Sequence, residues 1–550
     1  MGRRPPTRRM VRCIVPLLCA ALLAGCETQP LQQQIQQKIQ ALQSGEPTPI
    51  VLDAPLPPAP ERTWADAATD VNNNRIGGWG LVNMPGMRAY LNGLYRRIKE
   101  MGGHPDWPGE VYVLADPSLK STATAAGNIY LSMGWLQSME SEDEVFALLS
   151  HEFGHVYLGH HIIYDVTDAG DVASRVGRAA VGIARRASQK AAENGMLAVD
   201  MVSGFVGTNL VPIWKRSVEE EADNFGVVIS LRAGYSYPRG FKTVVERIAT
   251  YDEEARVATE KLLAATERTQ REAGGRAVLE QARRQQGNQK DYIGANESLN
   301  NLQVQLHDSM FDFNASVSRV LGAAAKRAQE THEDATAREE RLTRAVTPAL
   351  AGRPRPAART APWDAVRKDP ATAEILSHYT MTADAEDALL RNANAEALKL
   401  ATVAASGRTA SDAWPLYTLI RANQAVRPNA PTADLAKRQS TAPERSWRFE
   451  LYAIREEAKR NRPAARTRLN QQFDYFQKAP AMWPEMIAYL RDNGSLEEAR
   501  GMAQTCALRA GIYRASCLDS ATTDAERKVA QAASDRKAKE LVDKYGPKIR

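Results

Sequence analysis

The chain has 550 residues, more than one hydrophobic core usually organises, so two or three domains are expected. Aromatic residues make up only 7% while alanine and arginine recur in long helical runs, which favours a mainly α chain over a β-sandwich. The formal net charge of +6 includes five arginines before position 13, and without them it is 6 − 5 = +1, which argues against a nucleic-acid partner.

The first residues have the pattern of an export signal. Arginines precede an apolar run from Cys13 to Leu23, which is too short to remain as a membrane-spanning helix. The segment Leu23-Ala24-Gly25-Cys26 resembles a bacterial lipobox, and acylation of Cys26 after cleavage would anchor the mature chain to a membrane. Glu27 stands where lipoproteins of the inner membrane commonly have aspartate, so we expect the periplasm and the outer membrane. The alternative is an ordinary cleaved signal in which Cys26 is incidental.

The next elements lead towards a helix with a metal-binding pattern. Residues 28–63 are rich in glutamine and then in proline, which predicts an extended tether. Apolar spacing predicts a helix over 87–101, and short apolar runs predict strands at 111–114 and 128–132. We expect the edge of the second strand to hold a substrate backbone extended across a metal site. The alternative is that the strand simply completes a small sheet.

Residues 141–161 read SEDEVFALLSHEFGHVYLGHH and predict a buried helix that begins at a capping box. His151 and His155 are four positions apart, so both imidazoles leave the same helix face, as two ligands of one zinc require. Glu152, about 100° away, can take a proton from water beside the metal. His160 lies about 900° beyond His151 on a continuous helix, which predicts a structural role on the opposite face.

A third protein ligand is found in a later acidic run. Glu219 and Asp223 share one helix face, so with Glu219 on the metal, Asp223 could accept the outer N–H of a zinc-binding histidine. Adjacent glutamates more often form a solvated helix surface, and we keep that interpretation for Glu220 and Glu221.

At this point the chain resembles the zinc metallopeptidase family that includes the CAAX prenyl proteases and the HtpX heat-shock proteases. The matching segments are Gly127-Asn128-Ile129-Tyr130-Leu131, Gly134-Trp135-Leu136, Ser141 to His155, His160, Ser217, Glu219, Ala222, Asp223 and Gly226. The resemblance implies one Zn²⁺ held by His151, His155 and Glu219. It also implies Glu152 as the catalytic base and Asp223 as a supporting catalytic residue. Without a membrane-spanning core, the chain is most similar to the family's periplasmic branch, in which tetratricopeptide repeats follow the peptidase domain.

The resemblance also brings in a histidine far along the chain. Thr331-His332 with the downstream run 338–342 is similar to a family segment, although Glu333 replaces the usual proline. In the periplasmic branch such a histidine can take the fourth zinc position and hold the enzyme latent, which implies a regulatory role for His332. The alternative is an exposed histidine in a charged helix. Residues 168–213, which precede this segment, are predicted to form a helical hairpin over the active site.

A second proline-rich linker and a helical region complete the chain. Beyond the linker, short amphipathic helices are punctuated by glycine and proline, and 483–508 reads as a helix-turn-helix without a strict 34-residue period. Cys506 and Cys517 remain after loss of the signal, so in an oxidising compartment they are a disulfide candidate; the alternative is two free thiols.

We therefore predict a mainly α protein, with a zincin-type α+β catalytic domain followed by a domain of tetratricopeptide-like hairpins. The expected parts are a signal peptide (1–25), a tether (26–63), a zinc metallopeptidase domain with a long helical insertion (64–350), a linker (351–362) and a helical repeat-like domain (363–550). The expected function is zinc-dependent cleavage of misfolded or stalled envelope proteins. The alternative is a chaperone or assembly-factor lipoprotein whose helical domain binds partners, such as outer-membrane assembly machinery, with proteolysis secondary.

Overall fold

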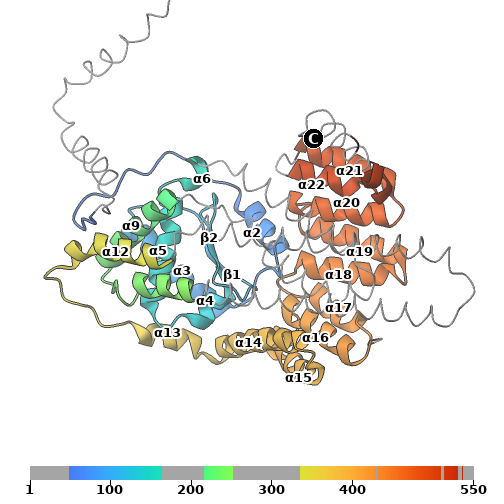
Figure 1. Ribbon diagram of the computed structural model, residues 1–550, viewed down its shortest axis with the longest axis horizontal. Coiled ribbons are helices and arrows are strands. Elements are labelled where there is room, and N and C mark those ends of the chain that lie inside the picture. Colours follow the sequence, from blue (N-terminus) through green and yellow to red (C-terminus); the bar gives the residue numbers. More distant parts are fainter. Residues whose placement is uncertain are drawn as a thin grey trace, which may run out of the picture.

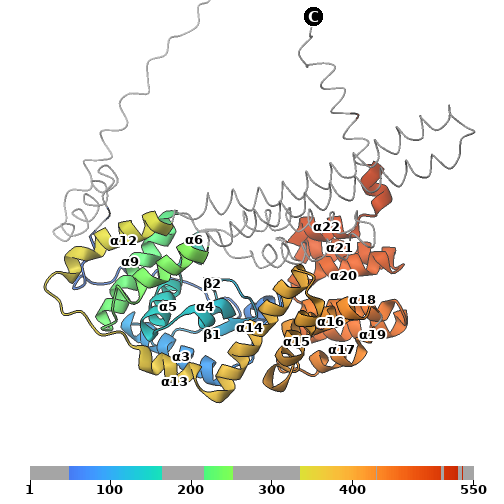
Figure 2. The ribbon, with the colours of Figure 1, turned by 60° about the horizontal axis from the view of Figure 1, so that its bottom comes forward.

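The computed structural model describes residues 47, 49–163, 216–251, 335–428, 430–509, 513–529 and 536. These residues form a sheet-containing part wrapped by helices and, beside it, a stack of helices (Figures 1 and 2). The predicted mainly α class with a small sheet is confirmed. Cys26, the predicted hairpin at 168–213 and His332 lie outside the described residues. Among the described helices, none has the length and apolar composition needed to cross a bilayer.

Most helices and strands of the sheet-containing part contribute to a large hydrophobic core, and Val71, Leu81, Leu114 and Tyr130 form a smaller cluster. Its elements are α2 (Ala67–Ile76), α3 (Pro85–Met101), β1 (Val111–Leu114), β2 (Ser121–Ala123), β3 (Ile129–Ser132), α4 (Met133–Ser138), α5 (Glu142–Tyr157), α6 (His160–Ile163), α9 (Arg216–Arg232) and α12 (Ala335–Leu350). Residues 241–251 are also helical.

The sheet has the order β1-β3-β2, so β3 is its central strand. β3 runs parallel to β1 and antiparallel to β2, and its four residues are all buried. The expectation that this strand offers a free edge to substrate is therefore wrong, because both of its sides are already hydrogen-bonded. The terminal strand beside α5 is β2, whose three residues are too few to give a sequence signal.

Helix α5 is fully buried and is held at its start by three acidic side chains. Ser141 accepts the N–H of Glu144, which is the predicted N-cap. Glu142 accepts hydrogen bonds from the hydroxyls of Tyr90 and Tyr235, at 2.6 and 2.8 Å. The acidic residues that favour a helix start by their charge thus also tie α5 to its neighbours. These contacts fix the direction of the histidines that follow about two to four turns later.

Two glycines let α5 and α9 pack in close contact. A Cβ atom on Gly154 would lie 2.9 Å from the carbonyl oxygen of Ala222, and one on Gly226 would lie 2.9 Å from the backbone nitrogen of His151. Real Cβ atoms do not approach backbone this closely, so a side chain at either position would push the helices apart. This close crossing brings the acidic residues of α9 to the histidines of α5.

The N-terminal stretch of the described chain contacts this part instead of standing away from it. Ile50 and Leu52 are buried in its core, and Tyr157 at the end of α5 donates to the carbonyl of Pro57 at 2.9 Å. Arg62 donates to the carbonyls of Val156 and Tyr157 and stacks over Trp107. Residues 49–63, the predicted end of the tether, are therefore docked on the sheet-containing part.

The remaining helices form a curved stack that α14 connects to the sheet-containing part (Figure 1). The stack comprises α13 (Thr360–Arg367), α14 (Pro370–Leu390), α15 (Asn394–Ala404), η1 (Gly407–Thr409), α16 (Ala413–Val426), α17 (Ala433–Ser440), α18 (Trp447–Ala458), α19 (Arg462–Tyr475), η2 (Pro480–Met482), α20 (Trp483–Asp492), α21 (Leu496–Arg509) and α22 (Arg514–Ala521). The predicted helix-turn-helix at 483–508 corresponds to α20 and α21, joined at Gly494 with φ of 92°.

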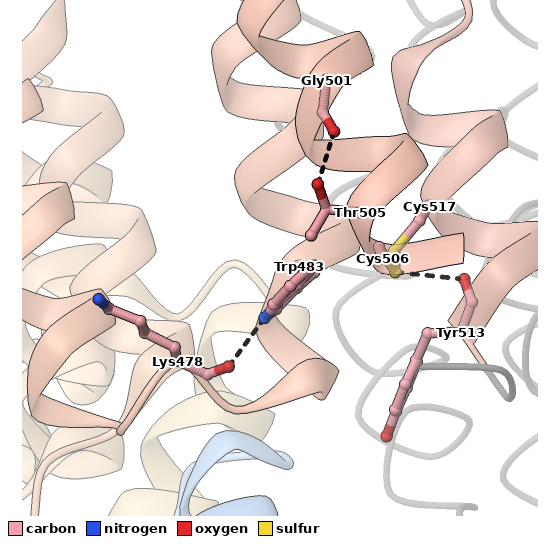
Figure 3. Close-up of a disulfide and its surroundings, with 7 residues drawn as sticks. All are labelled: Lys478, Trp483, Gly501, Thr505, Cys506, Tyr513 and Cys517. Atoms are coloured by element: carbon pink, nitrogen blue, oxygen red, sulfur yellow. Dashed lines mark hydrogen bonds between the residues drawn. A yellow bond between two sulfur atoms is a disulfide. The ribbon is translucent and has the colours of Figure 1, made fainter. Parts of the chain in front are cut away.

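Contacts on two sides join the stack to the sheet-containing part. The indole of Trp363 on α13 is buried and donates to the carbonyl of Met139 at 2.9 Å. On the other side, Arg75 of α2 forms an ion pair with Glu444 at 2.7 Å. At the far end of the stack, Cys506 and Cys517 are joined in a disulfide that links α21 to α22 (Figure 3).

Candidate metal centre

Three side chains from two helices converge where α5 and α9 cross. The Nε2 atoms of His151 and His155 lie 3.3 Å apart, as expected from their spacing of one helix turn. Glu219 of α9 faces both, with its carboxylate oxygens 3.5 Å from Nε2 of His151 and 3.4 Å from Nε2 of His155. One donor atom from each residue lies within 4.8 Å of the other two, so a single ion can contact all three.

The donor set fits zinc. Two imidazoles and one carboxylate, with room for a further ligand, are a common catalytic zinc set. Both histidines are buried, whereas Glu219 keeps part of its side chain exposed to solvent. Burial, followed by the neighbouring imidazoles, lowers the pKa of His155 well below its usual value, which favours the neutral form that can bind a metal.

A buried carboxylate supports the first histidine from behind. Asp223 is fully buried and its Oδ1 lies 2.9 Å from Nδ1 of His151, on the opposite side of the ring from Glu219. Arg338 of α12 donates two hydrogen bonds to Asp223, at 2.8 and 2.7 Å. Burial alone would raise the pKa of Asp223, but Arg338 and the adjacent His151 outweigh it and hold that pKa below its usual range.

Glu152 lies next to this cluster, and only 4% of its surface is exposed. Burial raises its pKa, and the charges of His151 and a hydrogen bond from Ser121 on β2 offset part of that rise. A carboxylate with a raised pKa is suited both to accept a proton and to return it. Ser121 also brings the terminal strand of the sheet beside this residue.

His160 does not lie on the helix face opposite to His151, because α5, the helix that carries the motif, ends before it. α5 stops at Tyr157, Gly159 adopts φ of 68°, and α6 begins at His160. This turn folds the His160 ring back against His155, with their Nδ1 atoms 2.9 Å apart. The predicted placement of His160 on the opposite face is therefore wrong, and His160 is not among the three residues whose donor atoms converge.

The structure brings five of the sequence-predicted residues together and separates others. His151, Glu152, His155, Glu219 and Asp223 form one cluster, while Cys506 and Cys517 belong to a different hydrophobic core. Glu220 lies 3.5 Å from Arg341. Sequence reasoning missed the role of Arg338. A signal was available, since Arg338 falls in the run 338–342 that resembles a family segment.

The segment that contains this cluster is similar to a known protein family. Residues 89–267 match the model described as Peptidase family M48, which covers less than half of the chain. The segment is therefore similar to the M48 peptidases, which are zinc metallopeptidases. It contains the motif on α5 and the acidic residues of α9.

Individual relatives are similar to this chain over segments of 160 and 170 residues. The beta-barrel assembly-enhancing protease of Escherichia coli strain K12 is 22% identical over 170 residues, which is 30% of this chain and 34% of the relative. A Vibrio cholerae serotype O1 protein, which carries the same name in provisional form, is 24% identical over 160 residues, 28% of this chain and 31% of the relative. The chain thus spans about a third of the length of these curated relatives.

Proposed function

We propose that this chain is a zinc-dependent endopeptidase of the bacterial cell envelope, with His151, His155 and Glu219 as the zinc ligands. The observation that carries the proposal is the convergence of these three side chains at the crossing of α5 and α9, with Glu152 beside them. Bound zinc supplies Lewis-acid polarisation of a scissile carbonyl and makes water acidic enough to lose a proton near neutral pH.

Glu152 acts as the general base and then as the general acid. It accepts the proton of the attacking water and passes it to the leaving amine, so that the carboxylate is regenerated when the peptide bond has broken. Its burial supports this double role, because a raised pKa makes both transfers accessible at neutral pH. Asp223 holds the His151 ring by its outer nitrogen and keeps the other nitrogen directed at the ligand set.

The substrate backbone binds in extended form along β2. This strand ends the sheet, lies against α5, and carries Ser121 next to Glu152. Addition of a substrate strand to such an edge positions a peptide through main-chain hydrogen bonds, with little dependence on its sequence. This suits cleavage of unfolded chains rather than of one motif.

Unfolded or misassembled envelope proteins are the proposed substrates, and the names of the relatives support this class. We place the chain in the periplasm, attached through Cys26 to the outer membrane, on the signal pattern of its first residues. The helical stack would dock substrates or assembly machinery, as curved helical arrays do. In the latent form, His332 would take the remaining zinc position.

The test compares the wild type with Glu152→Gln. The variant should keep one zinc per chain and lose cleavage of an unfolded β-barrel protein by at least about 100-fold, which is the lower range for a general base. Glu140→Gln, at an exposed position just before α5, is the matched control and should keep full activity. Cleavage by zinc-loaded Glu152→Gln at the wild-type rate would overturn the proposed mechanism.

A further inference from the structure

The outer nitrogens of the two metal-site histidines have different partners. Nδ1 of His151 contacts the carboxylate of Asp223, whereas Nδ1 of His155 lies 2.9 Å from Nδ1 of His160. Partners of this kind are usually a carboxylate, a backbone carbonyl or water, and they fix the tautomer and the orientation of a ligand ring. For His155, the partner of the outer nitrogen is instead another imidazole, that of His160.

The roles of the nitrogens follow from the geometry. Nε2 of His155 faces the other donor atoms, at 3.3 Å from His151 and 3.4 Å from Glu219. A ligating nitrogen carries no proton, so the neutral His155 ring must carry its proton on Nδ1. This N–H can donate a hydrogen bond to His160 only if Nδ1 of His160 carries no proton and acts as the acceptor. His160 then carries its own proton on Nε2, which lies 3.7 Å from a carboxylate oxygen of Glu221.

The surroundings support a built contact. His160 is 1% exposed, and its ring meets that of His155 at an interplanar angle of 71° with centroids 5.0 Å apart. The turn at Gly159 that breaks the helix is what allows this approach. An imidazole acceptor also satisfies His155 without adding a further buried negative charge to a site that already contains Glu152, Glu219 and Asp223.

We propose that His160 is a positioning residue, which accepts the outer N–H of His155 and thereby sets the tautomer and angle at which His155 presents Nε2 to the metal. The inference rests on the proposed zinc peptidase function. It assigns His160 no contact with the metal or the substrate.

The experiment measures zinc affinity and the visible absorption of Co²⁺-substituted protein in full-length variants. His160→Leu removes the acceptor and should weaken zinc binding about 10–100-fold, the usual loss for such partners. His160→Asn places an amide oxygen near the position of Nδ1 and should restore affinity to within a few-fold of the wild type. The Co²⁺ absorption spectrum depends on ligand geometry. It should differ from that of the wild type in His160→Leu and return towards it in His160→Asn. His378→Leu, which removes a buried histidine of the helical stack, is the matched control and should leave zinc affinity unchanged.

Zinc-loaded wild type provides a measurement that needs no variant to fold. The ¹⁵N shifts of its labelled histidines should show His160 as the Nε2–H tautomer, and an Nδ1–H tautomer would overturn the inference. Equal zinc affinity and an unchanged Co²⁺ spectrum in His160→Leu would also overturn it while leaving the proposed function intact. A wild type that binds no stoichiometric zinc would refute the proposed function, and this inference with it.

Discussion

Arg338 and Asp223 form a bidentate pair behind the metal site, with hydrogen bonds of 2.8 and 2.7 Å between residues 115 positions apart. The pair joins α12 to α9 and compensates a carboxylate that has no exposed surface. Because Asp223 in turn contacts His151, the position of a metal-site ring depends on a helix that is distant in the sequence.

Replacement of Arg338 by methionine should leave Asp223 as a buried, poorly compensated charge. We expect unfolding of the chelator-treated protein to require about 3–5 kcal/mol less free energy, the usual cost of breaking such a pair. Added zinc should recover part of this loss, since its charge also compensates the site. Denaturant titrations with chelator and with zinc measure both effects. Arg344→Met, at an exposed position of the same helix, is the control. Equal stability of Arg338→Met and Arg344→Met would contradict the prediction.

The close crossing of α5 and α9 should be intolerant of a methyl group. Gly226→Ala would place Cβ 2.6 Å from Cζ of Phe241 as well as against the backbone of His151, so α9 must shift. We expect a loss of about 1–3 kcal/mol in stability from overpacking, and a lower zinc content because Glu219 moves with α9. Elemental analysis and denaturant titration measure the two effects.

Gly93→Ala is the control for that substitution. Gly93 lies in α3, and a Cβ there meets nothing within 4 Å. Alanine in place of a helical glycine should raise stability by about 0.5–1 kcal/mol, with no change in zinc content. If Gly226→Ala behaved in the same way as Gly93→Ala, the close crossing would not be needed for the metal site.

The helical stack should become less stable as the pH rises through about 6. Burial raises the pKa of Asp412 to about 6, which a hydrogen bond from the hydroxyl of Tyr379 only partly offsets. A carboxyl with a raised pKa in the folded state contributes stability that is complete below its unfolded pKa and is lost as the pH rises through the folded value. The loss between pH 4 and 7 is at most about 3 kcal/mol.

Asp412→Asn removes this titration while keeping an oxygen that Tyr379 can donate to. The variant should be more stable than the wild type at pH 7.5, and the difference should shrink towards pH 5. Denaturant titrations at both pH values test this, with Asp384→Asn at an exposed position of α14 as the control. A stability difference independent of pH would show that Asp412 does not titrate in this range.

Local sequence patterns predicted the elements that carry the chemistry. The capping residue Ser141, the apolar spacing and the histidines one turn apart describe interactions within a single helix, and those depend on the order of residues alone. The same holds for the hairpin of α20 and α21, whose break at Asn493-Gly494 is a local turn. For such features, neighbours in the sequence are neighbours in space.

The remaining features were decided by tertiary contacts. β2 is a strand because β3 supplies its hydrogen-bond partners, and its three residues have no periodicity of their own. Arg338 reaches Asp223 only because α12 packs beside α9, and residues 49–63 are held by carbonyls and a core that belong to later elements. His160 shows both levels at once: a left-handed turn at Gly159 ends the helix, and only the packing that follows selects His155 as its neighbour. The sequence by itself determined which groups could bind a metal, whereas the tertiary structure decided which groups support them, because support comes from residues whose separation along the chain carries no periodic signal.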